Sequence, residues 1–228
     1  MSAASLSPPT PSSPTPSSPA PAAPSSPAPS SPAPAAPVRR TARERLLAAA
    51  DELFYAEGVH IVGIDRIIER AGVAKASLYS TFGSKDELVR AYLQGREEAR
   101  RERLRAGLER FETPAEKLLG TFELLAEAAE RPGFRGCAFY NARAESGEDG
   151  PAREVADDSR AWTRALLIDL ARQAGARDPA ALAAQLVILY DGSMVGSRMD
   201  RDPATALGAR AVAGALLAAA TDTGVTTS

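Results

Sequence analysis

The nine residues from Ala74 to Phe82 bring together side chains that can donate hydrogen bonds to a nucleic acid. Lys75 carries an ammonium group and Tyr79 a phenol, and most of the remaining positions are small. An ammonium group can donate to guanine edges or to phosphate, a phenol can donate to phosphate, and small residues let a helix lie deep in a major groove. We therefore expect contacts to double-stranded DNA from Lys75, Ala76, Ser77, Tyr79, Ser80 and Thr81.

Two short helices separated by a glycine are predicted to position this segment. Before the glycine, apolar residues recur three or four positions apart from Ile64 to Ala71, which indicates one buried helix face. Gly72 can adopt the left-handed conformation of a tight helix end, and the apolar Val73 can fill the corner. The pattern indicates a helix-turn-helix, although such helix pairs also occur in proteins that bind no DNA.

Further helices and basic residues flank this pair. Arg43 to Gly58 has the apolar spacing of an amphipathic helix, and Ser84 followed by two acidic residues predicts the start of another helix. Lys85 is then expected near the DNA backbone. Arg39 and Arg40 could add to a positive rim, or they could simply be solvated residues at a domain boundary.

Residues 40–90 resemble the N-terminal DNA-binding domain of the TetR family of transcriptional regulators. The matching positions are Leu47-Ala48-Ala49-Ala50, Leu53-Phe54, Gly58, Ile67-Ile68-Glu69-Arg70-Ala71-Gly72-Val73, Ser77-Leu78-Tyr79, Phe82 and Ser84-Lys85-Asp86-Glu87-Leu88. Gly63 stands where the family usually has Ser or Thr, and Thr81 where it commonly has His. Gly63 can still serve as an N-cap, with Asp65 supplying a carboxylate near the helix start, but operator preference cannot be transferred.

Composition divides the 228 residues into four predicted parts. Residues 1–38 hold 13 of the 18 prolines and should form a disordered tail, residues 39–88 the DNA-binding domain, residues 89–222 a helical effector-binding and dimerisation domain, and residues 223–228 a short tail. No secretory signal is recognised and no apolar run is long enough to span a bilayer, so we expect a cytoplasmic protein without a membrane partner.

Charge does not mark the chain as a nucleic-acid binder, since its formal net charge is −2. Residues 39–88 hold equal numbers of basic and acidic groups, so tight binding should need two DNA-binding domains acting together. A long helix is expected from Lys85 to Phe111. Its densely charged stretch from Arg96 to Arg105 is interpreted as a solvated face, with DNA contact as the less favoured alternative.

The remainder predicts an all-α fold of about nine helices, the later ones covering roughly 114–131, 135–142, 152–175, 179–199 and 203–220. The last two are rich in Ala, Gly and Leu and apolar around most of their circumference, which favours a homodimer built through a four-helix bundle, as in the TetR family. The alternative is a pair of helices buried inside a monomer.

A small-molecule effector site is expected between the later helices. Gly136 to Asn141 weakly resembles a segment found in some TetR-family ligand domains, and the candidate lining residues, which could equally be plain core, are Cys137, Tyr140, Asn141, Trp162, Tyr190, Asp191 and Met194. Cys137 is the only cysteine, and it could sense oxidants only with a lowered pKa, for which Arg135 is the one hint; a small buried apolar role is favoured.

Catalytic and metal sites are not expected. His60 is the only histidine, so neither a zinc site nor a Cys/His pair can form, and no cofactor motif is present. The sequence favours a homodimeric regulator, most simply a repressor, that leaves a palindromic operator when an unknown small molecule binds. The alternatives are an all-helical binding protein or enzyme with a non-functional helix-turn-helix, and an interaction module that uses the Pro-rich tail as bait.

Overall fold

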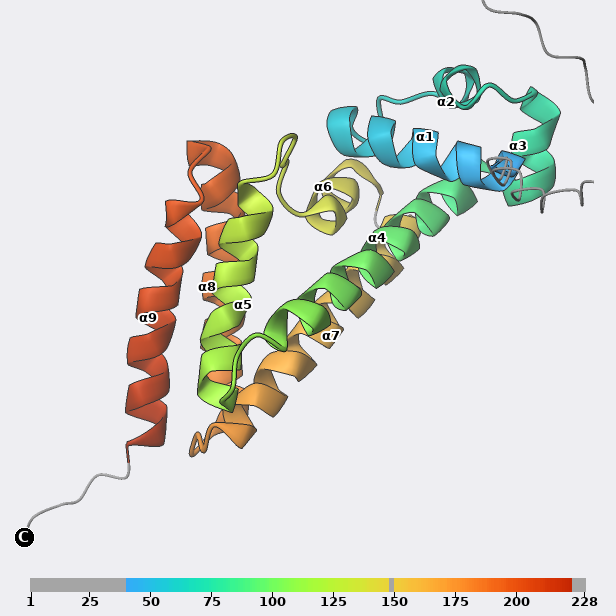
Figure 1. Ribbon diagram of the computed structural model, residues 1–228. Coiled ribbons are helices and arrows are strands. Elements are labelled where there is room, and N and C mark those ends of the chain that lie inside the picture. The colour runs from blue at the N-terminus through green and yellow to red at the C-terminus, as the bar shows by residue number, and fades with distance from the viewer. Residues whose placement is uncertain (1–39, 148–149, 223–228) are drawn as a thin grey trace, which may run out of the picture. The chain divides into compact units, whose positions relative to one another are not determined.

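The computed structural model describes residues 40–147 and 150–222, and in these ranges it contains nine α-helices and no β-strand (Figure 1). The expected all-α architecture is confirmed. All of the helices in the described residues lie between Ala42 and Thr221. The predictions for both tails and for Arg39 fall outside the described residues.

The first three helices are short and end where the sequence indicated. Helix α1 spans Ala42–Glu57, α2 spans Ile64–Ala71 and α3 spans Lys75–Phe82. A capping box between Thr41 and Glu44 begins α1, because the two residues satisfy each other's backbone N–H groups. Gly72 ends α2 at φ 61°, the left-handed conformation that glycine adopts without a steric cost.

Helices α4 and α5 are joined by a short turn and diverge from it (Figure 1). Helix α4 spans Lys85–Leu108 after its Ser84 cap, and α5 spans Pro114–Ala129 after a Thr113 capping box. The prediction that α4 would reach Phe111 was wrong by three residues. The ring of Phe111 turns back against Gly120 of α5, where a Cβ would overlap it, and the chain must leave the α4 axis to make this contact.

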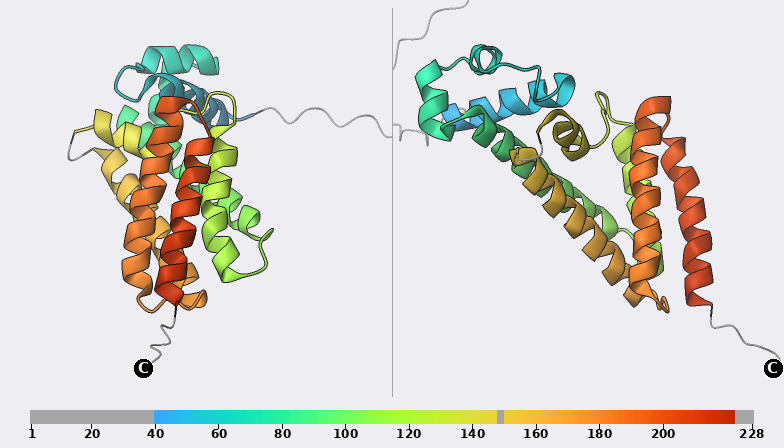
Figure 2. Two further views of the ribbon diagram at one scale, coloured as in Figure 1. Left: turned by 90° about the vertical axis from the view of Figure 1, so that its left-hand side faces the viewer. Right: turned by 180° about the vertical axis from the view of Figure 1, so that it is seen from behind.

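The last four helices are α6 (Ala138–Glu145), α7 (Pro151–Gln173), α8 (Pro179–Asp200) and α9 (Ala204–Thr221). Helices α8 and α9 pack side by side, and in the left view of Figure 2 no other described helix lies in front of them. The guanidinium of Arg177 donates to the carbonyl of Ala219 at 2.9 Å, so the α7–α8 turn holds the end of α9.

Two apolar cores share α4. The first contains residues of α1–α3 together with the start of α4, α6 and the start of α7; Leu88, Val89, Tyr92 and Leu93 contribute to it from α4. The second is built from the end of α4, α5, α7, α8 and α9, with Leu104 and Leu108 from α4. The packing of α1–α3 therefore continues past residue 88 into α4, α6 and α7.

Two sequence expectations about polarity need correction. Glu97 and Arg100 were assigned to a solvated face, but Glu97 is 5% exposed and accepts hydrogen bonds from Arg100, Arg101 and Ser159. The residues are buried because α7 packs along this side of α4. Helices α8 and α9, with mean hydropathies of 1.3 and 1.4, are by length and composition apolar enough to cross a membrane, contrary to expectation. Core helices of water-soluble proteins have the same composition, so this is weak evidence of a span.

Candidate nucleic-acid interface and ligand cavity

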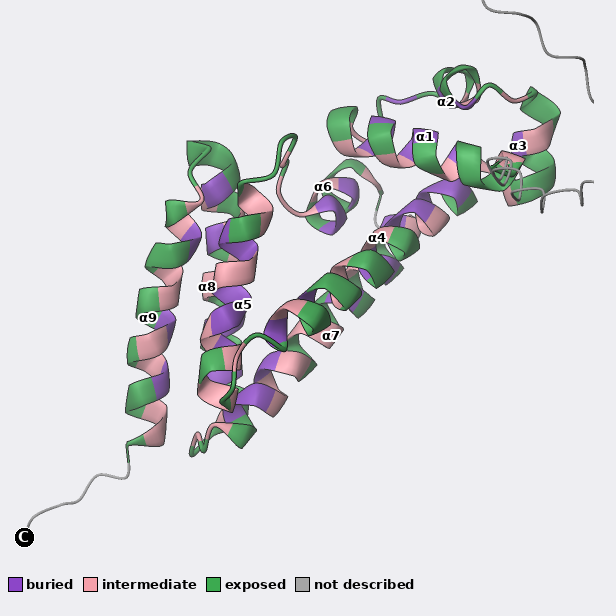
Figure 3. Cartoon of the chain, in the orientation of Figure 1, coloured by how far each residue is buried: buried purple, intermediate pink, exposed green. Residues whose placement is uncertain are grey.

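Helix α3 offers an outward surface of small and polar side chains. Leu78 is fully buried and anchors the helix, whereas Lys75, Ala76, Tyr79, Ser80 and Thr81 are exposed and Ser77 is half-buried (Figure 3). The structure thus brings the six predicted DNA-contacting residues of this segment onto one short helix. Tyr79, 45% exposed, is the largest of these side chains. The others are small enough, or flexible enough in the case of Lys75, to let the helix enter a major groove.

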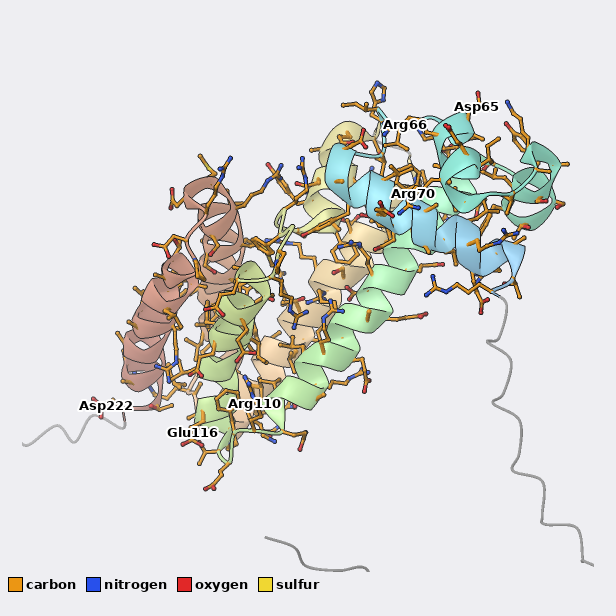
Figure 4. The ribbon with its side chains drawn as sticks, turned by 45° about the horizontal axis from the view of Figure 1, so that its top comes forward. Asp65, Arg66, Arg70, Arg110, Glu116 and Asp222 are labelled. Atoms are coloured by element: carbon orange, nitrogen blue, oxygen red, sulfur yellow. The ribbon has the colours of Figure 1, made fainter. Side chains whose placement is uncertain are left out.

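Helices α1 and α2 hold α3 in place through polar contacts. Arg45 of α1 donates to the carbonyl of Gly72 at 3.0 Å, which fixes the turn between α2 and α3. Arg66 and Arg70 of α2, labelled in Figure 4, form ion pairs with Glu57 and Glu52 of α1. Pairs as exposed as these contribute little free energy each, but bidentate geometry fixes orientation.

Lys75 is already paired in the absence of DNA. Its Nζ donates to Asp65 at 2.9 Å, and this hydrogen bond raises the pKa of Lys75. As expected, Gly63 is the N-cap of α2 and Asp65 places a carboxylate in its first turn; this carboxylate also pairs with Lys75. Contact with phosphate would therefore replace one partner of Lys75 by another.

The basic residues around α3 differ from the predicted set. Arg40 is exposed, as a rim residue must be. Lys85 turns inward: its Nζ lies 3.5 Å from the carbonyl oxygen of His60 and 6.0 Å from the Phe54 ring centre, and burial lowers its pKa. Arg43, which the sequence analysis left out, is exposed with its guanidinium over Phe82 at the end of α3. Its position three residues after Arg40 is the sequence signal that could have indicated a further phosphate contact.

Two adjacent cavities lie among the later helices. The α7–α8 cavity, about 1000 Å³, is bounded by α6, α7 and α8, and the α4–α5 cavity, about 690 Å³, lies between α1, α4, α5 and the segment before α6. Six of the seven predicted ligand residues line the first: Cys137, Tyr140, Asn141, Tyr190, Asp191 and Met194. Arg100, Gly136, Cys137, Phe139, Tyr190 and Met194 line both cavities.

Trp162 lines neither of these cavities. Its ring packs in the second core and is covered by guanidinium groups of α4, with Arg100 5.1 Å and Arg101 5.2 Å from the ring centre. Arg100, which the sequence analysis placed in solvent, is instead a wall residue of both cavities. The sequence gave no sign of the Glu97 carboxylate and the Ser159 and Thr163 hydroxyls that accept hydrogen bonds from it.

Cys137 caps the start of α6. Its Sγ accepts a hydrogen bond from the Tyr140 amide at 3.4 Å, and burial raises the pKa of the thiol. A redox sensor needs a lowered thiol pKa, so this environment favours the apolar structural role. The backbone N–H of Arg135 donates to the Tyr55 hydroxyl at 2.8 Å.

Helix α1 contacts the cavity wall directly. The Tyr55 hydroxyl of α1 donates to the carbonyl of Gly136 at 3.1 Å, and the Arg96 guanidinium lies 3.7 Å from the centre of the Tyr55 ring. At the other end of α6, Glu145 accepts from the backbone N–H of His60 at 3.1 Å. A movement of the segment at Gly136 would therefore change a direct hydrogen bond to α1.

Comparison with known proteins places this arrangement among bacterial regulators. Residues 46–92 match the family model described as bacterial regulatory proteins, tetR family. A TetR-family transcriptional regulator from Streptomyces coelicolor has 33% sequence identity and a TM-score of 0.74, covering 79% of this chain and 96% of its own. A tetR-type regulator from Streptomyces avermitilis has 34% identity and a TM-score of 0.71, covering 79% and 98%.

Curated relatives match over a minor part of this chain and less than half of their own lengths. The transcriptional activator FasR of Mycolicibacterium smegmatis is 50% identical over 56 residues, which are 25% of this chain and 26% of that protein. Matches to two further regulators cover 43% and 40% of their lengths. The chain therefore spans less than half the length of these curated relatives.

Proposed function

We propose a function from one premise: the chain belongs to the TetR family, and it is a DNA-binding transcriptional regulator. Our proposal is that it acts as a homodimeric repressor in the cytoplasm, where its operator DNA is found, and that a small molecule releases it from a palindromic operator. The observation that carries the DNA-binding part is the exposed α3 surface held rigidly by α1 and α2.

The proposed reading residues are Lys75, Ala76, Ser77, Tyr79, Ser80 and Thr81, and the proposed phosphate contacts are Arg39, Arg40 and Arg43. Two hydroxyls have restricted roles, because Ser80 and Thr81 both donate to the carbonyl of Ser77. These hydroxyl oxygens can still accept hydrogen bonds from base amino groups. Lys85 is a weaker candidate than the sequence indicated, since its ammonium group contacts His60.

Dimerisation is proposed through α8 and α9. Ile188, Val195 and Met199 are spaced seven and four residues apart on α8 and are 71%, 44% and 76% exposed. Leu207 and Val212 of α9 are also about half exposed. Contiguous exposed apolar side chains of this kind favour a protein interface, and two helices from each subunit would form a four-helix bundle. A two-fold dimer presents two α3 helices to half-sites about 34–36 Å apart.

Release is proposed to follow from the contacts between the cavity wall and α1. A ligand that displaces the segment at Gly136 breaks or moves the Tyr55 hydrogen bond to α1. Because α1 packs against α2 and α3, a shift of α1 also moves α3. The ligand can shift the equilibrium only by as much as it prefers the released conformation.

The test is selection of bound fragments from random DNA duplexes by the full chain. An inverted repeat with a fixed half-site spacing is the expected result, because the symmetry of a dimer is copied in its operator. The Lys75→Ala variant should select a different or weaker motif, whereas Arg172→Ala, an exposed substitution on α7, should select the same one. Recovery of no motif, or of a single unrepeated half-site, would contradict the proposal.

A further inference from the structure

The α4–α5 cavity has an excess of positive charge in its wall. Its charged residues are four arginines and two acidic groups: Arg96, Arg100, Arg103, Arg131, Asp51 and Glu127. Both acids are already engaged, Asp51 by Arg96 at 2.6 Å and Glu127 by Arg110 at 2.7 Å. Arg100 is likewise neutralised, because Glu97 accepts from it at 2.8 and 2.9 Å.

Two arginines of this wall, Arg103 and Arg131, are solvent-exposed and form no ion pair with a described residue. Within residues 40–147 and 150–222, no carboxylate forms an ion pair with Arg103 or Arg131. Burial lowers the pKa of Arg103, and the positive charges of Arg131, Arg96 and Arg100 lower it further. The end of α5 gives Arg131 a favourable partial charge, but this does not compensate a second guanidinium.

The walls beyond these arginines are apolar. Leu104, Leu124, Leu125 and Phe134 line the α4–α5 cavity, and Phe139 lies between it and the α7–α8 cavity. In the α7–α8 cavity the acidic groups are matched, since Arg143 pairs with Asp157 and Arg160 with Asp191. Arg198 there donates to the side-chain oxygen of Asn141 at 2.6 Å.

We propose that the effector is an amphipathic organic anion, whose carboxylate or phosphate lies between Arg103 and Arg131 and whose apolar body lies along Phe139. A planar guanidinium pair can bind either oxyanion through parallel hydrogen bonds. A cation of the same shape would meet uncompensated positive charge, and a neutral molecule would leave that charge unmatched. This inference rests on the proposed function, because it names the ligand class of the same site.

The position of the anion also explains how it would act on the DNA-contacting helix α3. Asp51 and Tyr55 of α1 line the same cavity, so the ligand would touch the helix that supports α3. An anion near Arg96 would compete with Asp51 for that guanidinium, which also stacks on Tyr55. The anion would therefore bind in the same cavity whose wall contains the Tyr55–Gly136 hydrogen bond to α1.

Calorimetric titration of the full chain without DNA tests the proposal with three probes of one chain length: decanoate, decanol and decylamine, each below its micelle concentration. We expect decanoate to bind at least tenfold more tightly than decanol, decylamine not to bind, and the preference to weaken with added salt. The double variant Arg103→Ala/Arg131→Ala should bind decanoate and decanol alike. Arg105→Ala should keep the preference, because Arg105 is an exposed arginine of α4 like Arg103 but does not line this cavity.

Equal affinity of the protein for decanoate and decanol, or a preference that survives in the double variant, would overturn the proposal. So would the absence of binding by both decanoate and an aryl carboxylate such as naphthalene-2-carboxylate. A thermal unfolding curve of the double variant shows whether its loss of preference reflects misfolding. Because DNA is absent, failure here leaves operator binding untouched, and failure of the operator selection leaves anion binding untouched.

Discussion

The α3 surface and the α8–α9 surface are both exposed, but their chemistry is opposite. The α3 surface consists of small and polar side chains that water can solvate until a phosphate or base edge replaces it. The α8–α9 surface holds the exposed apolar residues Ile188, Val195, Met199, Leu207 and Val212. Covering them with another apolar surface removes them from water and is therefore favourable. Exposure alone therefore does not identify a binding surface; its polarity says which kind of partner it fits.

The largest expected effect comes from changing the apolar surface. Ile188→Asp should weaken self-association at least ~100-fold, because a symmetric dimer would bury two carboxylates without partners. Ile61→Asp is the matched control, since Ile61 is 72% exposed and Ile188 71%. Sedimentation equilibrium measures both variants. An Ile188→Asp protein that dimerises like the wild type would show that the subunits pair elsewhere.

An intermediate effect is expected where α4 connects the two regions. Glu97→Gln should lower the free energy of unfolding by about 3 kcal/mol at pH 7, because Arg100 and Arg101 lose their shared countercharge. Burial opposes ionisation of Glu97, but the hydrogen bonds and charge of the two arginines prevail, and its pKa lies below the ordinary 4.5.

The pH dependence of this stabilisation has a definite sign. A carboxylate with a lowered folded-state pKa contributes its full stability above pH 4.5 and loses it as the pH falls through the folded-state value. The difference between wild type and Glu97→Gln in urea unfolding should therefore shrink below pH 4.5. Glu98→Gln, at the exposed neighbouring position, should change stability little at any pH. A constant difference from pH 7 to pH 3 would contradict this explanation.

The smallest effect is expected on the polar surface. Lys75→Ala should weaken operator binding about tenfold and change base preference, in keeping with the loss of about 1–3 kcal/mol for one base contact. Asp65→Ala should act in the opposite direction, because it frees Lys75 and removes a negative charge near DNA. Fluorescence anisotropy with operator and scrambled duplexes measures both changes. Equal weakening by the two variants would mean that the Lys75–Asp65 pair is structural.

Local signals explain why much of the fold was predictable. Thr113 and Ser84 fix helix starts because their side-chain hydroxyls accept hydrogen bonds from backbone N–H groups three residues later, and Gly72 fixes a helix end through its positive φ. These interactions span only a few residues, so their sequence pattern contains the whole cause. The candidate reading residues were predictable for the same reason, because a short helix fixes which neighbours share a face.

Contacts between distant segments were not predictable in this way. The charged stretch of α4 gave no sign that Glu97 meets Ser159 of α7, or that Trp162 is covered by arginines instead of lining a cavity. Lys85 likewise turned to His60, 25 residues away, because the loop carbonyl and the Phe54 ring occupy the space beside it. Many pairings of the 27 Lys and Arg residues are compatible with one sequence, and helix packing selects among them.

The sequence by itself determined the order of helices, the helix-turn-helix and the polarity of its outward residues, since each depends on neighbours within one or two helical turns. Tertiary structure alone decided which charges are neutralised. Arg96 pairs with Asp51 of α1 and Arg100 with Glu97 of α4, whereas Arg103 and Arg131 line the same cavity and form no ion pair with a described residue. The reason is physical: the energy of a charge depends on what packs around it, and packing joins residues that lie far apart in the chain.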